Sequence, residues 1–144
     1  MRCLPLLFLL LGCESGVPRL HDVRSVTINY GSRDRQRHGF TDNYRQIEVS
    51  NAKDVQALVE TFQVRSTHRL MLAAAFPGMV EFHLGDGSSV KCWFKEPDRV
   101  ECQEYQVYLR DRAFYELVNK LISKKEGRPT DILKIRSPAP VQRK

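Results

Sequence analysis

The sequence predicts an α+β domain in which an antiparallel sheet of about five strands carries two helices packed on one face. Three observations support this fold class. Short segments alternate apolar and polar residues, two segments carry apolar residues at helical spacing, and one hairpin register places two cysteines opposite each other. The chain has 144 residues, 42% of them hydrophobic, which suits one domain with a buried core and is too short for two.

Alternation of apolar and polar residues marks the strands. In the first segment, Val26, Ile28 and Tyr30 alternate with Thr27 and Asn29. Residues between the first two strands are charged and polar, which is typical of a loop. We expect that loop over residues 31–43 and strands over residues 23–30, 44–49, 80–84, 90–95 and 100–109, the last with a bulge or bend near Gln103 and Glu104.

Two segments have the spacing of amphipathic helices. Ser50 or Asn51 can cap the first helix, and Asp111 can cap the second. The apolar stripes are Val55, Leu58, Val59 and Phe62 in the first helix and Phe114, Leu117, Val118, Leu121 and Ile122 in the second. The segment 64–78 is ambiguous, because its apolar part Leu70–Ala75 could extend a helix or form a loop packed on the core.

The register of one hairpin can be tested within the sequence. Pairing Phe94 with Val100 across a turn at Pro97 places Cys92 directly opposite Cys102 and lays the apolar residues of both strands on one face. We therefore predict a buried disulfide between these cysteines. A metal site is the competing interpretation, but two cysteines without a matched histidine pair leave the ligand set incomplete. We expect no metal and no other cofactor.

The opening residues MRCLPLLFLLLGCESG combine a short positive start with an apolar run. The run Leu4–Leu11 has the length of a signal peptide and is too short to span a bilayer. It ends in Leu10-Leu11-Gly12-Cys13, which resembles the lipobox of bacterial lipoproteins. The resemblance implies cleavage between Gly12 and Cys13 and a diacylglycerol thioether on Cys13. An ordinary secretory signal is the alternative.

This resemblance implies that the protein is located in the bacterial cell envelope. The domain would lie outside the cytoplasm, anchored to the membrane by lipid on Cys13. The residue after Cys13 is Glu14 and not aspartate. By the rule of that family, this implies that the protein is sorted to the outer membrane if the organism has two membranes. Cys3 would leave with the signal, so Cys92 and Cys102 remain as an even pair in an oxidising compartment.

The chain divides by composition into four parts. We expect a signal peptide over residues 1–12, a lipidated tether over 13–22, the domain over 23–123 and a basic disordered tail over 124–144. The tail holds seven Lys or Arg against two acidic residues, whereas residues 46–123 hold nine basic and eleven acidic residues. The tail is either solvated or in contact with the membrane. We expect no nucleic-acid partner, since the tail lacks stacking aromatics and export would separate the domain from the nucleic acids of the cytoplasm.

No sequence motif indicates catalysis, and we expect a non-enzymatic binding domain. Asp98 and Glu101 are expected to be exposed hairpin charges rather than a catalytic pair. The candidate partner-binding residues are Trp93, which Tyr105, Val107 and Tyr108 could join, and the loop arginines Arg33, Arg35 and Arg37. Cover of Trp93 by the segment 70–77 is the alternative to a binding role. The partner would be an envelope protein or a cell-wall component. The alternatives are an inhibitor or immunity-like lipoprotein that acts on an exported enzyme and, third, a small hydrolase.

Overall fold

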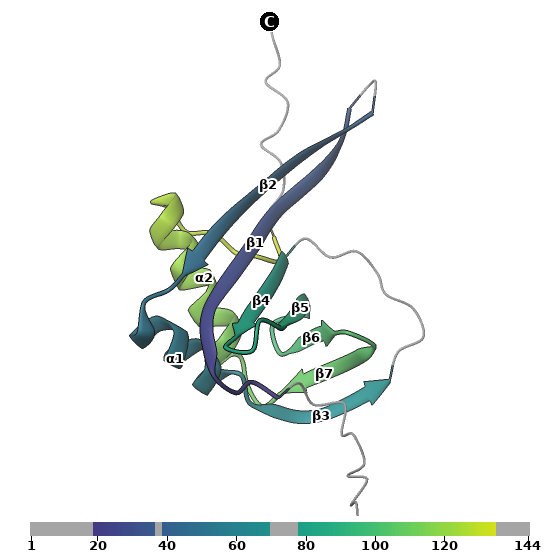
Figure 1. Cartoon of the computed structure of the whole chain (residues 1–144). Helices are drawn as coiled ribbons and strands as arrows, with labels where there is room; N and C mark the ends of the chain where they lie inside the picture. Colours follow the sequence, from purple (N-terminus) through teal and green to yellow (C-terminus); the bar gives the residue numbers. More distant parts are fainter. Residues whose placement is uncertain (1–18, 37–38, 70–77, 135–144) are drawn as a thin grey trace, which may run out of the picture.

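The computed structural model describes residues 19–36, 39–69 and 78–134 (Figure 1). The signal segment and Cys13 therefore lie outside the described residues. The strands are β1 (Val23–Gln36), β2 (Gly39–Val49), β3 (Val64–Arg69), β4 (Gly78–Leu84), β5 (Ser89–Glu96), β6 (Arg99–Cys102) and β7 (Tyr105–Leu109), and the helices are α1 (Ala52–Thr61) and α2 (Ala113–Glu126).

The strands form one antiparallel sheet of seven strands in the order β2-β1-β4-β5-β6-β7-β3. The prediction of an α+β fold with an antiparallel sheet and two helices is confirmed, while the number of strands was underestimated. Figure 1 shows α1 and α2 on the same side of the sheet. As predicted, Asn51 caps α1 by accepting a hydrogen bond from the Lys53 amide at 2.9 Å.

Four phenylalanines hold the two helices on one face of the sheet, which we call the core face. Phe114 of α2 contacts Phe82 of β4 and Phe94 of β5, with ring centroids 5.9 and 5.4 Å apart. Phe62, at the end of α1, contacts both Phe82 and Phe114. Burial of these rings removes a large apolar area from water, and their edge-to-face and stacked contacts add specific attraction.

The predicted disulfide is present in this structure. Cys92 pairs with Cys102 in the register of β5 and β6, two residues along each strand from the pair Phe94 and Val100. Their Cα atoms lie 4.4 Å apart, within the range that a disulfide allows. Both cysteines are buried on the core face, so the bridge is part of the core.

The predicted loop over residues 31–43 was wrong for the part that the structure describes. The pairing of β1 with β2 continues past Tyr30 as far as Gln36 opposite Gly39, while the pairing of β1 with β4 ends at Tyr30. The two strands therefore leave the sheet as a projecting hairpin, which is visible in Figure 1. Charged residues and Gly31 indicated a loop, but the backbone ladder of an existing hairpin extends through them.

Two further predictions about the strands need correction. Residues Val64–Arg69, for which the sequence predicts no definite element, form the edge strand β3 beside β7. Leu70–Ala75, with its two alternatives of helix or packed loop, lies outside the described residues. The expected bulge near Gln103 is a tight turn, since Cys102 pairs with Tyr105 and the chain reverses between β6 and β7. Gln103 has φ of 55°, the left-handed conformation that such short hairpin turns require.

The predicted disordered tail was wrong for residues 124–134. Helix α2 continues to Glu126, and Ile132 beyond it is completely buried. The Asn119 side chain accepts a hydrogen bond from the Ile132 amide at 2.8 Å. The Ile132 side chain fills the space that a Cβ atom on Gly78 would need. The segment after α2 therefore completes the core at the start of β4, and residues 135–144 lie outside the described part.

One ion cluster ties the end of α2 to the first hairpin. Glu126 accepts a hydrogen bond from the Tyr30 hydroxyl at 2.5 Å and forms a salt bridge with Arg45 at 2.5 Å. The hydrogen bonds from Tyr30 and then Arg45 lower the pKa of the Glu126 carboxyl. Burial, together with the bond to Glu126, raises the pKa of Tyr30 to about 12. These three side chains join segments that are far apart in the sequence.

Candidate functional site

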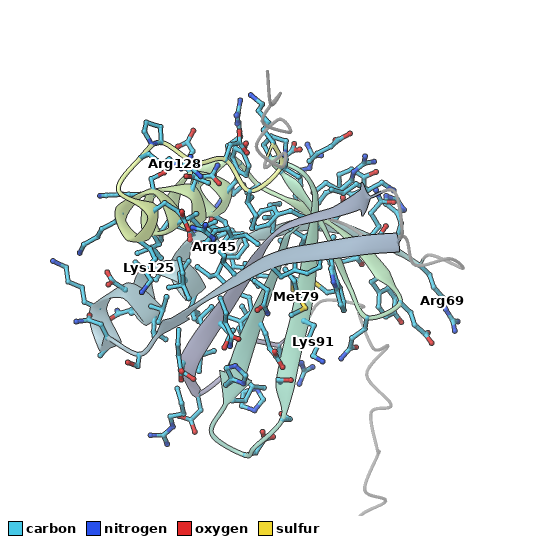
Figure 2. All side chains as sticks on the ribbon, turned by 90° about the horizontal axis from the view of Figure 1, so that it is seen from above. Arg45, Arg69, Met79, Lys91, Lys125 and Arg128 are labelled. Carbon is cyan, nitrogen blue, oxygen red and sulfur yellow. A yellow bond between two sulfur atoms is a disulfide. The ribbon has the colours of Figure 1, made fainter. Side chains whose placement is uncertain are left out.

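The second face of the sheet, which we call the outer face, carries the predicted binding residue Trp93. Strand alternation directs Cys92 and Phe94 to the core face and Trp93 to the outer face. Neither of the two described helices packs on the outer face (Figure 1). Figure 2 shows Lys125 and Arg128 on the α2 side of the sheet and Met79 and Lys91 on the other side.

Trp93 lies in the middle of a row that crosses the sheet. In the register, Trp93 is opposite Met79 on one side and Glu101 on the other. Directly opposed residues of antiparallel strands share a face and contact each other. From β1 to β3, the register pairs give a row of Asn29, Met79, Trp93, Glu101, Gln106 and His68. We call these six residues the outer row.

Glu101 is the most unusual member of the outer row, because it is a carboxylate buried on the face opposite the helices. Only 5% of the residue is exposed, so the prediction of an exposed hairpin charge was wrong. The Lys95 ammonium lies 3.5 Å from its carboxylate. A buried carboxylate requires such a partner, since removing an unpaired charge from water is costly. Trp93 is thus flanked by a fixed ion pair.

A second cluster surrounds Tyr108, next to the outer row. The Arg99 guanidinium lies over the Tyr108 ring at 5.8 Å and donates a hydrogen bond to Glu96 at 2.6 Å. When the Gln106 amide is oriented with its oxygen toward Arg99, that oxygen accepts two hydrogen bonds, of 3.0 and 2.8 Å. The His68 ring meets the Tyr108 ring edge to face. These contacts fix planar polar groups and an aromatic ring on the outer face.

Tyr105 is not part of this surface, so its predicted role beside Trp93 was wrong. It is opposite Cys102 in the register, on the core face, and packs against the hydrophobic core. Val107 is likewise a core residue, opposite Val100. Of the three residues expected beside Trp93, Tyr108 lies on the outer face, because β7 alternates to the other side there. Tyr105 and Tyr108 point to opposite faces of β7, and a bend in place of the turn left their faces undefined in the sequence.

The backbone of the predicted loop residues Arg33 and Arg35 does not lie beside Trp93 in the sheet. Arg33 and Arg35 lie in β1, in the part of the first hairpin that projects beyond the pairing with β4. Arg37 lies outside the described residues. Asn29 is the β1 residue of the outer row, and Arg33 follows it by four positions, about 13 Å along an extended strand. The backbone positions of Arg33 and Arg35 are therefore separate from the position of Trp93.

Sequence reasoning missed Glu101, Arg99 and Gln106 as parts of the surface. The alternation that identifies Val100 and Cys102 as core residues also assigns Glu101 to the outer face. That signal was available in the sequence. The sequence gives no signal for the burial of Glu101, because this burial depends on Lys95 and on neighbours from other strands.

The part of the chain that the structure describes contains no group of three or more metal-ligating side chains. Within the same residues, neither helix is long and apolar enough to span a bilayer. Comparison with known protein families, with curated proteins and with solved structures found no match for this chain.

Proposed function

We propose that this protein is a lipid-anchored component of the bacterial cell envelope, and that its outer sheet face binds an envelope partner. The protein is not an enzyme in this proposal. The half-buried Trp93, held in the outer row between Met79 and the Lys95–Glu101 ion pair, is the observation that carries it. The anchor rests on the lipobox resemblance of residues 10–13.

The outer face has the composition of a binding surface rather than of a purely solvated one. Trp, Tyr and Arg are the residues that dominate binding energy in protein interfaces, because they bury a large area at a low entropic cost. Trp93, Tyr108 and Arg99 all lie on this face. Their polar neighbours already have partners within the chain, so a binding partner can cover them without leaving a buried charge unpaired.

The anchor is tested by replacing Cys13 with Ser in the full chain expressed in a bacterium. Because the thioether needs the thiol, metabolic labelling with a radioactive or clickable fatty acid should disappear and the uncleaved precursor should accumulate. Cys3→Ser is the matched control and should keep its label. Unchanged labelling of the Cys13→Ser protein would refute the lipid anchor, and an unlabelled, normally processed wild type would favour an ordinary secretory signal.

The binding face is tested by site-specific photo-crosslinking in intact cells. A benzophenone amino acid at position 93 should give an adduct of defined mass, whereas the same group at the exposed Gln56 of α1 should not. Equal adducts at both positions, or none at position 93, would contradict the proposal. An adduct with an exported enzyme that the purified chain inhibits would instead support the inhibitor alternative.

A further inference from the structure

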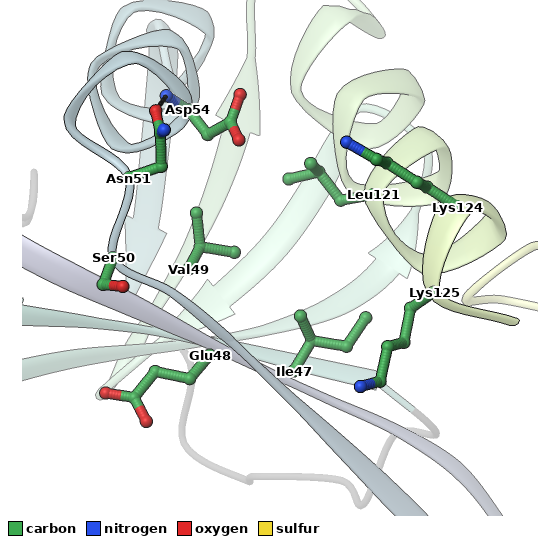
Figure 3. A pocket seen from close by; sticks show the side chains of 9 residues that line it. All are labelled: Ile47, Glu48, Val49, Ser50, Asn51, Asp54, Leu121, Lys124 and Lys125. Atoms are coloured by element: carbon green, nitrogen blue, oxygen red, sulfur yellow. Dashed lines mark hydrogen bonds between the residues drawn. The ribbon is translucent and has the colours of Figure 1, made fainter.

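A groove lies on the opposite side of the molecule from the outer face, where α1 and α2 diverge above the end of β2. It has a volume of about 430 Å³, within the range of small-molecule sites. Figure 3 shows the end of β2 crossing below it, the start of α1 along one side and α2 along the other. The residues that matter here are Ile47, Val49, Leu121, Asp54, Lys124 and Lys125.

The floor of the groove is apolar. Ile47 and Val49 are alternate residues of β2 and face the helices, and Leu121 belongs to the apolar stripe of α2. Ile47 and Leu121 are only partly buried, although both pack against the core. The stripe of α2 is therefore wider than the surface that the sheet and α1 cover, and its uncovered edge lines the groove.

The rim of the groove is positively charged. Lys124 and Lys125 extend from α2 beside Leu121 and Ile47 (Figure 3). Neither lysine has a salt-bridge partner among the described residues. The adjacent carboxylate, Glu126, is already bound by Tyr30 and Arg45.

Two acidic residues, Glu48 and Asp54, are among those that line the groove, but they do not cancel this charge. Glu48 lies between Ile47 and Val49 in β2, so alternation directs it away from the helices, as Figure 3 also shows. Asp54 remains, in the first turn of α1, where the positive end of the helix dipole offsets part of its charge. Two lysines thus face one carboxylate across an apolar floor.

We propose that this groove binds a small amphipathic anion, with the anionic group between Lys124 and Lys125 and the apolar part on Ile47, Val49 and Leu121. This site is separate from the outer face and does not depend on the function proposed for it. A free fatty acid and a monoalkyl phosphate share the required chemistry. A membrane surface does not fit a site of this size, because its lipids present head groups and not chains.

The experiment uses the full mature chain, residues 13–144, secreted behind an ordinary cleavable signal with Cys13→Ser so that no lipid is attached. Octyl phosphate is titrated by calorimetry and by amide chemical shifts in nuclear magnetic resonance spectra. It should bind at least tenfold more tightly than butyl phosphate, which shares the head group, because the longer chain covers more of the floor. Octyltrimethylammonium, with the same chain and the opposite charge, should bind more weakly as well.

Substitution of the lysines tests the head-group contact. The double variant Lys124→Gln, Lys125→Gln should weaken octyl phosphate binding about five- to tenfold. The matched control Lys91→Gln, Lys120→Gln removes the same charge from other exposed positions and should leave the affinity unchanged. Circular dichroism of each variant shows whether it has folded.

Three results would overturn the inference. They are equal affinity for the anionic and cationic octyl probes, equal loss in the two double variants, and shift changes that avoid Ile47, Asp54 and Leu121. Binding to anionic phospholipid vesicles without binding of octyl phosphate would also overturn it, and would assign the two lysines to the membrane surface instead. Dodecanoate in place of octyl phosphate distinguishes a carboxylate from a phosphate preference.

Discussion

Phe94 and Trp93 are neighbours in β5, yet they belong to two surfaces of different character. Phe94 is completely buried on the core face, against Phe114 and the other rings that hold the helices. Trp93 lies half-buried on the outer face, beside charged side chains that have their own partners. The difference shows that one strand can contribute alternate residues to an apolar core and to a face of paired polar groups.

The two faces also differ in how they bury polar groups. The buried residues of the core face are apolar apart from tyrosine hydroxyls, whereas Thr27, Glu101 and Gln106 are buried on the outer face. Among the described residues, no buried side-chain polar atom lacks a hydrogen-bond partner. On the outer face, hydrogen bonds and ion pairs between polar groups therefore hold the buried side chains in place, instead of apolar packing.

The largest effect should come from the centre of the core face. Phe114→Ala removes a completely buried ring that contacts Phe62, Phe82 and Phe94. We expect the free energy of unfolding to fall by about 3–5 kcal/mol, as is typical of buried Phe→Ala substitutions. Urea denaturation measures it. A loss below about 1 kcal/mol would mean that the helices are not held on the sheet by these rings.

A slightly smaller loss should follow a change outside the regular elements. Ile132→Ala removes a completely buried side chain from the segment after α2, with an expected cost of about 2–5 kcal/mol. The partly buried neighbour Leu133 is the control, and Leu133→Ala should cost less. If neither substitution changed the free energy of unfolding in urea, the burial of Ile132 would be contradicted, and the segment would behave as the disordered tail that the sequence predicts.

Removal of the disulfide should have an effect of similar or smaller size. The bridge spans ten positions, for which the loop-entropy relation gives about 3 kcal/mol. The double variant Cys92→Ala, Cys102→Ala should lose up to that amount in urea denaturation. Mass spectrometry after alkylation of the unreduced protein provides the complementary check. Two alkylated thiols in the wild type would contradict the register of β5 and β6.

The smallest effect concerns the ion cluster at the end of α2 and depends on pH. The pKa of Glu126 is lowered from about 4.5 in the folded protein. The ionised Glu126 carboxylate therefore adds to the free energy of unfolding in full above pH 4.5. This stabilisation is lost as the pH falls through the lower pKa of the folded state. The pKa of Tyr30, raised from 10.0 to about 12, makes the contribution of its hydroxyl complete below pH 10 and lost as the pH approaches 12.

Thermal denaturation of wild type and Glu126→Gln between pH 3 and pH 8 measures this linkage. The wild type should melt at the higher temperature near pH 7, and the difference should shrink below about pH 4.5. Glu116→Gln, at an exposed position of α2, is the control and should show little difference at any pH. A difference for Glu126→Gln that is constant over the whole range would contradict the linkage.

The sequence predicted those elements whose apolar pattern is complete. The helices and the strands β4, β5 and β6 place apolar residues at every position that faces the core, and the cysteine pair fixes one register independently. Strand β3 escaped detection because it is an edge strand whose residues are all partly or fully exposed. Ile132 escaped because one inserted side chain produces no periodicity.

The candidate site was predicted only in part for a related reason. Trp93 could be assigned to the outer face from parity alone, since β5 alternates without interruption. Tyr105 was misassigned because the turn after Cys102 was interpreted as a bend within one strand. The pairing of Glu101 with Lys95 and the groove beside Leu121 depend on contacts between distant segments, which no local pattern encodes.

The separation of the two faces is tested most directly by replacing the neighbours Trp93 and Phe94 one at a time with alanine. Phe94→Ala should lower the free energy of unfolding by about 3–5 kcal/mol. Trp93→Ala should cost about 1 kcal/mol or less, the size of a cross-strand pair contribution, while it abolishes binding of the partner identified by crosslinking at position 93. Equal destabilisation by the two substitutions, or undiminished partner binding by a folded Trp93→Ala protein, would contradict the account.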